Sequence, residues 1–279
     1  DHTETFTFTP KAKPDLTAPF QVTPEIYNQA ITVGNNCSWD GDDHHVKLGN
    51  GAWDDTKKTA ILVFSGRPDK LTFSYATSYN LAVIEIGQTG NPQWEVEESS
   101  DGENWKSIWS VRTNSTSWAD AEIPLSETTQ YVRFSYDGNY AGYFKNINIS
   151  ELVGYKYLRA ADGHYLSRGA KWGTQAVVDA FGVVSRLSRY THDNENIYTR
   201  FFFVDNEQYM FETETEDEQR LHEVFTDHGT ALNTNHLWQI NDNGGILTIQ
   251  SANEVGVVSH KGNYITAVKG VLAFTTNEA

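Results

Sequence analysis

Sulfur-containing residues and long apolar runs are both scarce in this sequence. One of the 279 residues is cysteine and one is methionine. A single cysteine excludes an intrachain disulfide, so the chain fits a cytosolic protein or a bacterial exported one better than a disulfide-rich module. No stretch approaches the roughly 20 apolar residues that a membrane-spanning helix needs. We therefore expect no membrane span in this chain.

Positive charge is scarce as well. The chain has 21 Lys and Arg residues against 37 Asp and Glu residues, which gives a net charge of −16 at pH 7. Acidic residues outnumber basic ones in both halves of the chain. A surface of this sign repels phosphate backbones and anionic membranes. We therefore expect no nucleic-acid partner.

Sequence signatures of catalysis are missing. The chain has no Gly-x-Ser-x-Gly elbow, phosphate loop or dinucleotide fingerprint, and Cys37 lacks a supporting catalytic pattern. Glu95, Glu97 and Glu98 are the candidate carboxylates for a glycosidase, but Glu95 and Glu97 share one face of a strand and Glu98 takes the other. Such enzymes need two carboxylates that converge across a cleft. We predict that the chain is not an enzyme, and keep a glycoside hydrolase as the less favoured alternative.

Aromatic residues are abundant, with 14 Tyr, 14 Phe and 8 Trp. Aromatic and β-branched residues favour strands, and short alternating runs between Gly, Asn and Asp clusters predict an all-β chain. The best helix candidate is a turn or two at 180–189, and the proline-containing segment 11–24 predicts an extended connector or edge. The strands predicted in the first half are 5–9, 30–33, 45–48, 59–64, 70–75, 81–87, 93–99, 106–112, 119–124, 131–136 and 144–151.

The run 94–108 predicts a hairpin, in which Asp101-Gly102 supplies the positive φ that a tight turn needs. This "strand, S-x-D-G-x-x-W, strand" pattern resembles the sandwich modules of bacterial surface proteins. Further runs at 45–49, 71–75, 131–134 and 144–149 extend the resemblance over roughly residues 30–152. The resemblance implies a galactose-binding-like jelly roll, an antiparallel β-sandwich, with residues 1–29 as an extended lead-in.

The second half contains a weak internal repeat, whose three units begin at Tyr155, Phe202 and Trp238. Three such units predict a β-trefoil. The run 163–176, GHYLSRGAKWGTQA, resembles the trefoil-like modules of bacterial secreted proteins. Ricin-type trefoil lectins carry a Q-x-W signature, whereas this chain has the order Trp238-Gln239, so no sugar site is carried over from them. We place the boundary near 152, with a sandwich module at 1–152 and a trefoil-like module at 153–279.

Aromatic residues in loops are the best ligand candidates, because a ring can stack on a sugar while neighbouring polar groups bond its hydroxyls. Each of these aromatics could equally fill a core. The predicted ligand-binding residues are Trp118, Asp137, Asn139, Tyr140, Tyr143 and Trp172.

A dense acidic cluster at 39–45 is the candidate metal site. Calcium prefers carboxylate oxygens on a loop, and Asp40, Asp42 and Asp43 are its candidate ligands. The alternative is a plain acidic turn. Zinc is disfavoured because adjacent histidines on a strand, His44 and His45, point to opposite faces. We expect no other cofactor.

Together these features predict a non-catalytic carbohydrate-binding or adhesive module pair from a secreted or cell-surface bacterial protein. Its partner would be a glycan or a host or surface protein, and we expect a monomer. The alternative is a structural or protein-interaction spacer within a larger multi-module protein. The sequence opens at Asp1 without an initiator methionine or signal peptide, so we expect a processed or trimmed chain.

Overall fold

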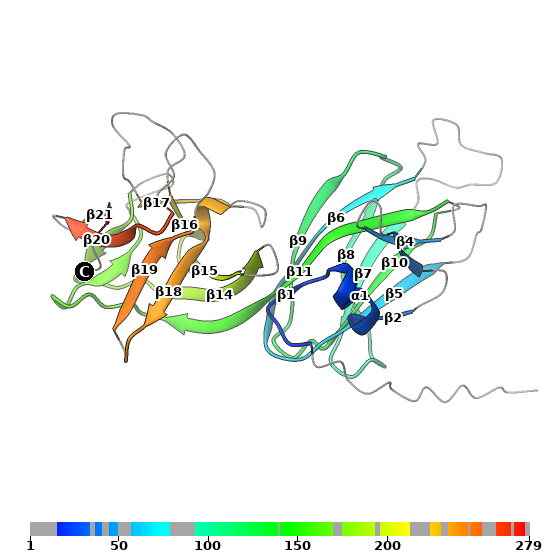
Figure 1. The fold of residues 1–279 in the computed structure, drawn as a ribbon, viewed down its shortest axis with the longest axis horizontal. Helices are drawn as coiled ribbons and strands as arrows, with labels where there is room; N and C mark the ends of the chain where they lie inside the picture. Colours follow the sequence, from blue (N-terminus) through cyan, green and yellow to red (C-terminus); the bar gives the residue numbers. More distant parts are fainter. Residues whose placement is uncertain are drawn as a thin grey trace, which may run out of the picture. The chain divides into compact units, whose positions relative to one another are not determined.

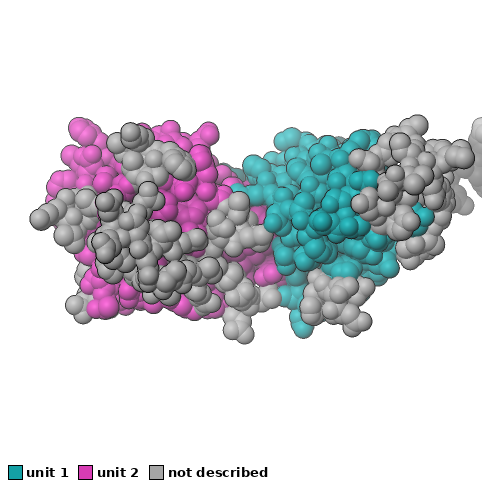
Figure 2. Space-filling view, turned by 90° about the horizontal axis from the view of Figure 1, so that it is seen from above, with its two compact units in different colours: residues 1–18, 22–66, 73–147 teal, residues 19–21, 67–72, 148–279 magenta. Residues whose placement is uncertain are grey.

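The protein is nearly all β, with antiparallel sheets, as the sequence predicts (Figure 1). It forms two compact units, unit 1 with residues 1–18, 22–66 and 73–147, and unit 2 with residues 19–21, 67–72 and 148–279 (Figure 2). No helix in the described part of the chain is long and apolar enough to cross a membrane. The computed structural model describes residues 16–33, 37–40, 45–49, 57–78, 93–138, 140–169, 175–192, 196–212, 224–229, 234–244, 246–252, 261–268 and 271–276.

Two groups of paired strands build the first half of the chain. The first is an antiparallel sheet, with the order β2 (Ile31–Val33), β5 (Lys58–Val63), β10 (Tyr131–Tyr136), β7 (Gln93–Ser99) and β8 (Lys106–Arg112). The second surrounds β11 (Gly142–Lys156), and its other strands are β1 (Phe20–Gln21), β3 (Cys37–Asp40), β4 (His45–Leu48), β6 (Pro68–Thr77) and β9 (Ala119–Pro124).

Aromatic rings join these two sheets into a β-sandwich. Phe73 of β6 and Phe144 of β11 contact Phe134 of β10 at centroid distances of 5.5 and 4.8 Å. Trp94 of β7 lies edge-on to Phe144 at 5.0 Å and is fully buried. Side chains alternate between the faces of a strand, so residues on either side of each ring point away from the core. This alternation turns Tyr143 and Lys145, the neighbours of Phe144, away from the core.

The predicted hairpin at Asp101-Gly102 joins β7 to β8. Gly102 has a φ of +79°, which favours glycine. The Asp101 carboxylate accepts hydrogen bonds from the backbone N–H groups of Glu103 and Asn104, both at 2.8 Å, and from the Ser99 hydroxyl at 2.9 Å. Side-chain bonding of this kind stabilises a turn, which is why the short pattern identified the hairpin.

The described part of the predicted connector or edge at 11–24 contains strand β1, and a short helix, α1 (Pro24–Ala30), begins at its last residue. Thr23 caps the helix, with its hydroxyl accepting from the N–H of Ile26 at 3.3 Å. Threonine at the cap and proline at the first helical position are typical of a helix start, so the signal was present in the sequence. The predicted strands at 5–9 and 81–87 lie outside the described residues.

Unit 2 consists of further antiparallel strands around its own core. Leu187, Phe201, Phe203, Met210 and Trp238 are buried together, and the Trp238 indole donates to the Met210 carbonyl at 3.0 Å. The elements after β11 are β12 (Tyr165–Ser167), β13 (Val177–Asp179), β14 (Ser185–His192), β15 (Asn196–Phe203), β16 (Gln208–Glu212), β17 (Val224–Asp227), η1 (Thr234–His236), β18 (Trp238–Asp242), β19 (Leu247–Ser251), β20 (Tyr264–Val268) and β21 (Val271–Thr275).

The helix candidate at 180–189 is wrong. Residues 185–192 form strand β14, which pairs antiparallel with β15 along its whole length, from Ser185 opposite Phe203 to His192 opposite Asn196. Leu187 of β14 enters the core of unit 2. The ladder hydrogen bonds and this burial outweigh a weak local helix preference.

Strand pairing in unit 2 follows a repeated order. An antiparallel hairpin recurs three times along unit 2, as β12–β13, β16–β17 and β20–β21. Between them, β11 pairs with β14, β14 with β15, β15 with β18, and β18 with β19. Strand β19 precedes the third hairpin as β15 precedes the second and β11 the first. The predicted start of the third repeat, Trp238, is the first residue of β18 and stays a prediction. The predicted β-trefoil and the predicted boundary at 152 stay predictions.

Candidate functional site

A pocket of about 400 Å³ opens on unit 1 next to the β4 and β11 strands. Its size falls within the roughly 300–1,000 Å³ that is typical of small-molecule sites. Polar and aromatic side chains alternate around it. The pocket is lined by His45, Ala76, Thr77, Ser78, Thr116, Trp118, Tyr143 and Lys145.

Three rings form one wall of this pocket. His45 and Tyr143 lie 4.4 Å apart between ring centroids, and Trp118 lies 6.2 Å from His45 and 6.5 Å from Tyr143. His45 is buried, whereas Trp118 is 39% exposed. The buried imidazole and the half-buried phenol lie next to the indole, which keeps an accessible ring surface. Ring surfaces of this kind bind the apolar face of a ligand.

Backbone hydrogen bonds join the end of β6 to the loops around the pocket. The Thr77 N–H donates to the Ser115 carbonyl at 3.0 Å, and the Ser78 N–H donates to the Ala141 carbonyl at 2.9 Å. Within the loop before Trp118, the Ser115 hydroxyl accepts from the Ser117 N–H at 3.1 Å. Serine side chains stabilise turns through such local bonds. The hydroxyls of Ser78 and Thr116 therefore stand on an ordered rim, beside the buried Thr77.

The core fixes the position of Tyr143 through the residue before it. Gly142 packs so closely that an added Cβ would lie 2.6 Å from Trp94 Cη2 and 2.8 Å from Tyr136 Cγ. The strand can approach the buried indole only because residue 142 lacks a side chain. Gly142 pairs with Leu48 of β4 and Tyr143 with Lys47, which places Tyr143 beside the strand that carries His45.

A single ammonium group lies at the aromatic wall among the described residues. Lys145 Nζ is 4.1 Å from the centroid of the Trp118 ring, which is a cation–π contact. Lys145 shares a face of β11 with Tyr143, because residues two apart on a strand point the same way. The wall thus combines an exposed ring, a cation and several hydroxyls.

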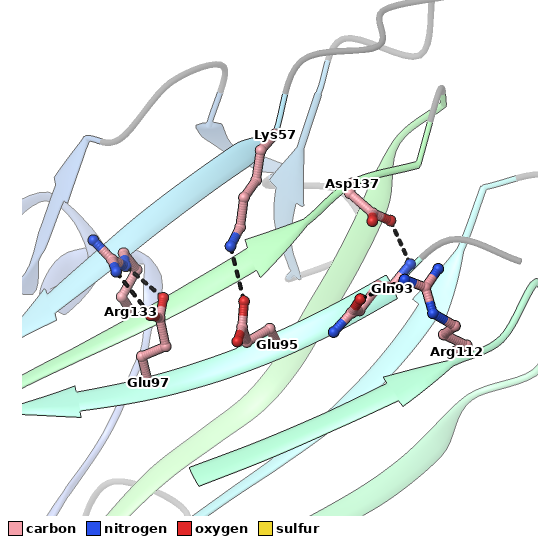
Figure 3. A network of polar contacts seen from close by, with 7 residues as sticks. All are labelled: Lys57, Gln93, Glu95, Glu97, Arg112, Arg133 and Asp137. Atoms are coloured by element: carbon pink, nitrogen blue, oxygen red, sulfur yellow. Dashed lines mark hydrogen bonds and ion pairs between the residues drawn. The ribbon is translucent and has the colours of Figure 1, made fainter. Parts of the chain in front are cut away.

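The structure brings together two of the predicted ligand-binding residues, Trp118 and Tyr143. Asp137 instead accepts a hydrogen bond from the backbone N–H of Gln93, the first residue of β7 (Figure 3). Tyr140 is half-buried and does not line the pocket. Asn139 and Trp172 lie outside the described residues, so their predicted roles stay predictions.

His45, Lys145 and the rim hydroxyls were missed by sequence reasoning. Lys145 could have been found, since the alternation that turns Tyr143 away from the core applies equally to the residue two positions later. His45 was considered only as part of the acidic cluster. The rim hydroxyls are contributed by loops that no local pattern brings together.

The calcium prediction is not decided by the geometry. Asp42 and Asp43 lie outside the described residues, and the backbone of Asp40 pairs with His45 across β3 and β4. Among the residues that the structure describes, no three His, Cys, Asp or Glu side chains gather as a metal-ligand group.

Two of the candidate glycosidase carboxylates, Glu95 and Glu97, are bonded to neighbouring cations (Figure 3). Glu95 accepts from Lys57 Nζ at 2.8 Å, and this hydrogen bond lowers the pKa of Glu95 despite partial burial. Glu97 accepts two bonds from the Arg133 guanidinium, at 2.7 and 2.8 Å. Both carboxylates are therefore paired with a cation, and the lowered pKa of Glu95 keeps that carboxylate ionised.

The third candidate, Glu98, is buried beneath a loop. It accepts from the Ser126 N–H at 2.9 Å and from the Thr129 hydroxyl at 2.7 Å. Burial raises the pKa of Glu98, but these hydrogen bonds outweigh it and the net pKa is lowered. A buried carboxylate satisfied by backbone and hydroxyl donors anchors a loop. None of the three glutamates lines the pocket.

The fold and the pocket define a β-sandwich protein with an aromatic site. No family model matches the chain, and the search of curated proteins found no match. Among solved structures, a cleaved adhesin domain of Lys-gingipain from Porphyromonas gingivalis w83 is 12% identical, with 38% of this chain and 73% of that chain covered and a TM-score of 0.31. A mutant of the family 29 carbohydrate-binding module CBM29-2, complexed with cellulohexaose, is 10% identical, with 49% and 87% covered and a TM-score of 0.31.

Proposed function

We propose that the chain is a non-catalytic binding protein whose pocket in unit 1 holds a sugar residue of a glycan. One observation carries the proposal: the exposed Trp118 ring, supported by His45 and Tyr143, stands beside hydroxyl-bearing side chains at a pocket of about 400 Å³. A pyranose has an apolar face of C–H groups and a rim of hydroxyls. It therefore needs a ring to stack on and polar groups around that ring.

The same geometry disfavours hydrolysis as the role of this site. A glycosidase needs two carboxyl groups on opposite sides of the scissile bond, about 5–10 Å apart. The described lining of the pocket contains no Asp or Glu. The glutamates considered as candidates bond to Lys57, Arg133 and the Ser126 loop instead. Binding without bond cleavage is the function that these residues support.

We also propose that unit 2 is a β-trefoil and that the protein acts outside the cell. The recurring hairpins and the pairing order from β11 to β19 support the trefoil. The resemblance of the run 163–176 to trefoil-like modules of bacterial secreted proteins supports the location. Both points are independent of the ligand pocket in unit 1.

A glycan array followed by calorimetry of the strongest binder tests the proposal. Trp118→Ala removes the stacking surface, so we expect affinity to fall by about tenfold, which corresponds to about 1.4 kcal/mol. Phe181→Ala is the matched control, because it removes an exposed ring, 83% accessible, from unit 2. We expect its affinity to equal that of the wild type.

Two outcomes would overturn the proposal. One is an array without any bound glycan, tested with protein whose folding is verified by circular dichroism. The other is a glycan that binds Trp118→Ala as tightly as it binds the wild type. Binding to a surface protein together with a negative array would instead support the protein-interaction alternative.

A further inference from the structure

The pocket has a charge opposite to that of the whole chain. The net charge of the protein is −16. The described residues that line the pocket nevertheless include one lysine, Lys145, and no Asp or Glu. A carboxylate lining would repel an anionic ligand and bond the hydroxyls of a neutral one. The absence of carboxylates from the described lining, in so acidic a chain, favours a ligand that carries negative charge.

Lys145 is available to such a ligand. Within the part of the chain that the structure describes, Lys145 forms no ion pair with a carboxylate. Its Nζ contacts the face of Trp118 instead, at 4.1 Å from the ring centroid. Six other described cations are paired with carboxylates, namely Lys57, Lys106, Arg133, Arg168, Arg186 and Arg189.

The acidic residue that follows Trp118 most closely in the sequence is hydrogen-bonded elsewhere. Asp120 of β9, two residues after Trp118, accepts a hydrogen bond from the Ser74 hydroxyl at 2.6 Å. The same hydroxyl accepts from the Asn146 side-chain amide at 3.2 Å, next to Lys145 in β11. Asp120 is thus bonded within this network and does not line the pocket. The N–H groups of the Lys145 ammonium can therefore donate to a ligand in the pocket.

On the basis of the proposed sugar-binding function, we infer that the pocket selects sugars that carry an anionic group, either a carboxylate, as in a uronic acid, or a sulfate. The pyranose contacts the accessible part of the Trp118 ring, and its anionic group accepts from Lys145 Nζ, which lies over a face of that ring. A charged hydrogen bond in a partly desolvated pocket contributes more than a neutral one. The threonine and serine hydroxyls of the rim bond the remaining hydroxyls.

An array that contains neutral, uronic-acid-bearing and sulfated oligosaccharides tests this inference. We expect the strongest binders to be acidic, and their affinity to fall as the salt concentration rises. A uronic acid ligand is then compared with its methyl ester, which removes the charge and keeps the sugar backbone. A sulfated ligand is compared with its desulfated form, and the two comparisons separate carboxylate from sulfate.

Variants of Lys145 assign the selectivity to this side chain. Lys145→Met removes the charge and keeps the length of the stem, so affinity for the acidic ligand should fall about tenfold. Affinity for the uncharged form should change little. Lys145→Arg retains a cation and should keep the preference, and Lys156→Met, the same change on an exposed lysine of β11, is the control.

The outcomes separate this inference from the function on which it rests. Neutral glycans as the strongest binders would overturn the anionic selectivity and leave sugar binding intact. An acidic ligand that binds Lys145→Met as tightly as the wild type would overturn the role of Lys145. An array without any binder would overturn both proposals.

Discussion

Replacing Gly142 with alanine should destabilise unit 1, because the sandwich core has no space for a methyl group there. The added Cβ would lie 2.6 Å from Trp94 Cη2, 2.8 Å from Trp94 Cζ3 and 2.8 Å from Tyr136 Cγ. Contacts below 3.0 Å force the indole or the strand to move within a densely packed interior. Overpacking of this kind lowers the free energy of unfolding by about 1–3 kcal/mol.

Urea and thermal unfolding, followed by tryptophan fluorescence, measure this loss. Each kcal/mol corresponds to a decrease in Tm of roughly 2–8 °C for domains of about 60–250 residues. Because Gly142 immediately precedes Tyr143 in β11, glycan affinity should fall together with stability. A Gly142→Ala protein as stable as the wild type would refute the packing argument.

A double-mutant cycle with Trp94→Phe identifies the cause of the loss. Phenylalanine lacks the outer indole atoms that the new methyl group would meet, Cη2 and Cζ3. Gly142→Ala should therefore cost less in the Trp94→Phe background than in the wild type. An equal cost in both backgrounds, within about 0.5 kcal/mol, would show that the two sites are independent and that the contact with the Trp94 indole is not the cause.

Two further predictions concern titrating groups. Hydrogen bonds from Asn104, Glu103 and Ser99 lower the pKa of Asp101 in the folded protein. The ionised carboxylate therefore stabilises the fold at pH values above its pKa in the unfolded chain, about 3.9. This stabilisation is lost as the pH falls through the lower pKa of the folded protein. The difference in free energy of unfolding between wild type and Asp101→Asn should shrink on acidification below pH ~4; a constant difference would contradict this. Burial raises the pKa of the Cys37 thiol, so iodoacetamide should modify it at least about tenfold more slowly than free cysteine at neutral pH. An equal rate would contradict it.

The strands of the sandwich could be read from the sequence, because their alternation is local. The predicted bounds of β4, β7, β8, β9 and β10 agree with the structure. The hairpin was predictable because Asp101 and Gly102 stabilise the turn with their own side chain and backbone. Strand β14 could not be predicted in this way, because its pairing with β15 and the burial of Leu187 depend on residues distant in sequence.

The site was predictable only where a residue's exposure could be guessed from its loop. Trp118 and Tyr143 were chosen on that ground and lie in one pocket. Asp137 was chosen on the same ground, yet its carboxylate bonds the backbone of Gln93. Local sequence does not show whether a loop carboxylate meets a ligand or a strand end. The place of Lys145 over Trp118 depends on the approach of β11 to the loop before β9, which only the tertiary structure shows.

The central claim is that a glycan contacts Trp118, and indole NMR tests it most directly. The chain has 8 tryptophans, so each indole N–H of a ¹⁵N-labelled sample can be followed during a titration with the array's strongest binder, and Trp118→Phe assigns one signal. We predict that the Trp118 signal moves in proportion to saturation, while that of Trp105, in the β7–β8 hairpin region, does not. A saturated protein whose Trp118 signal is unchanged would contradict the account.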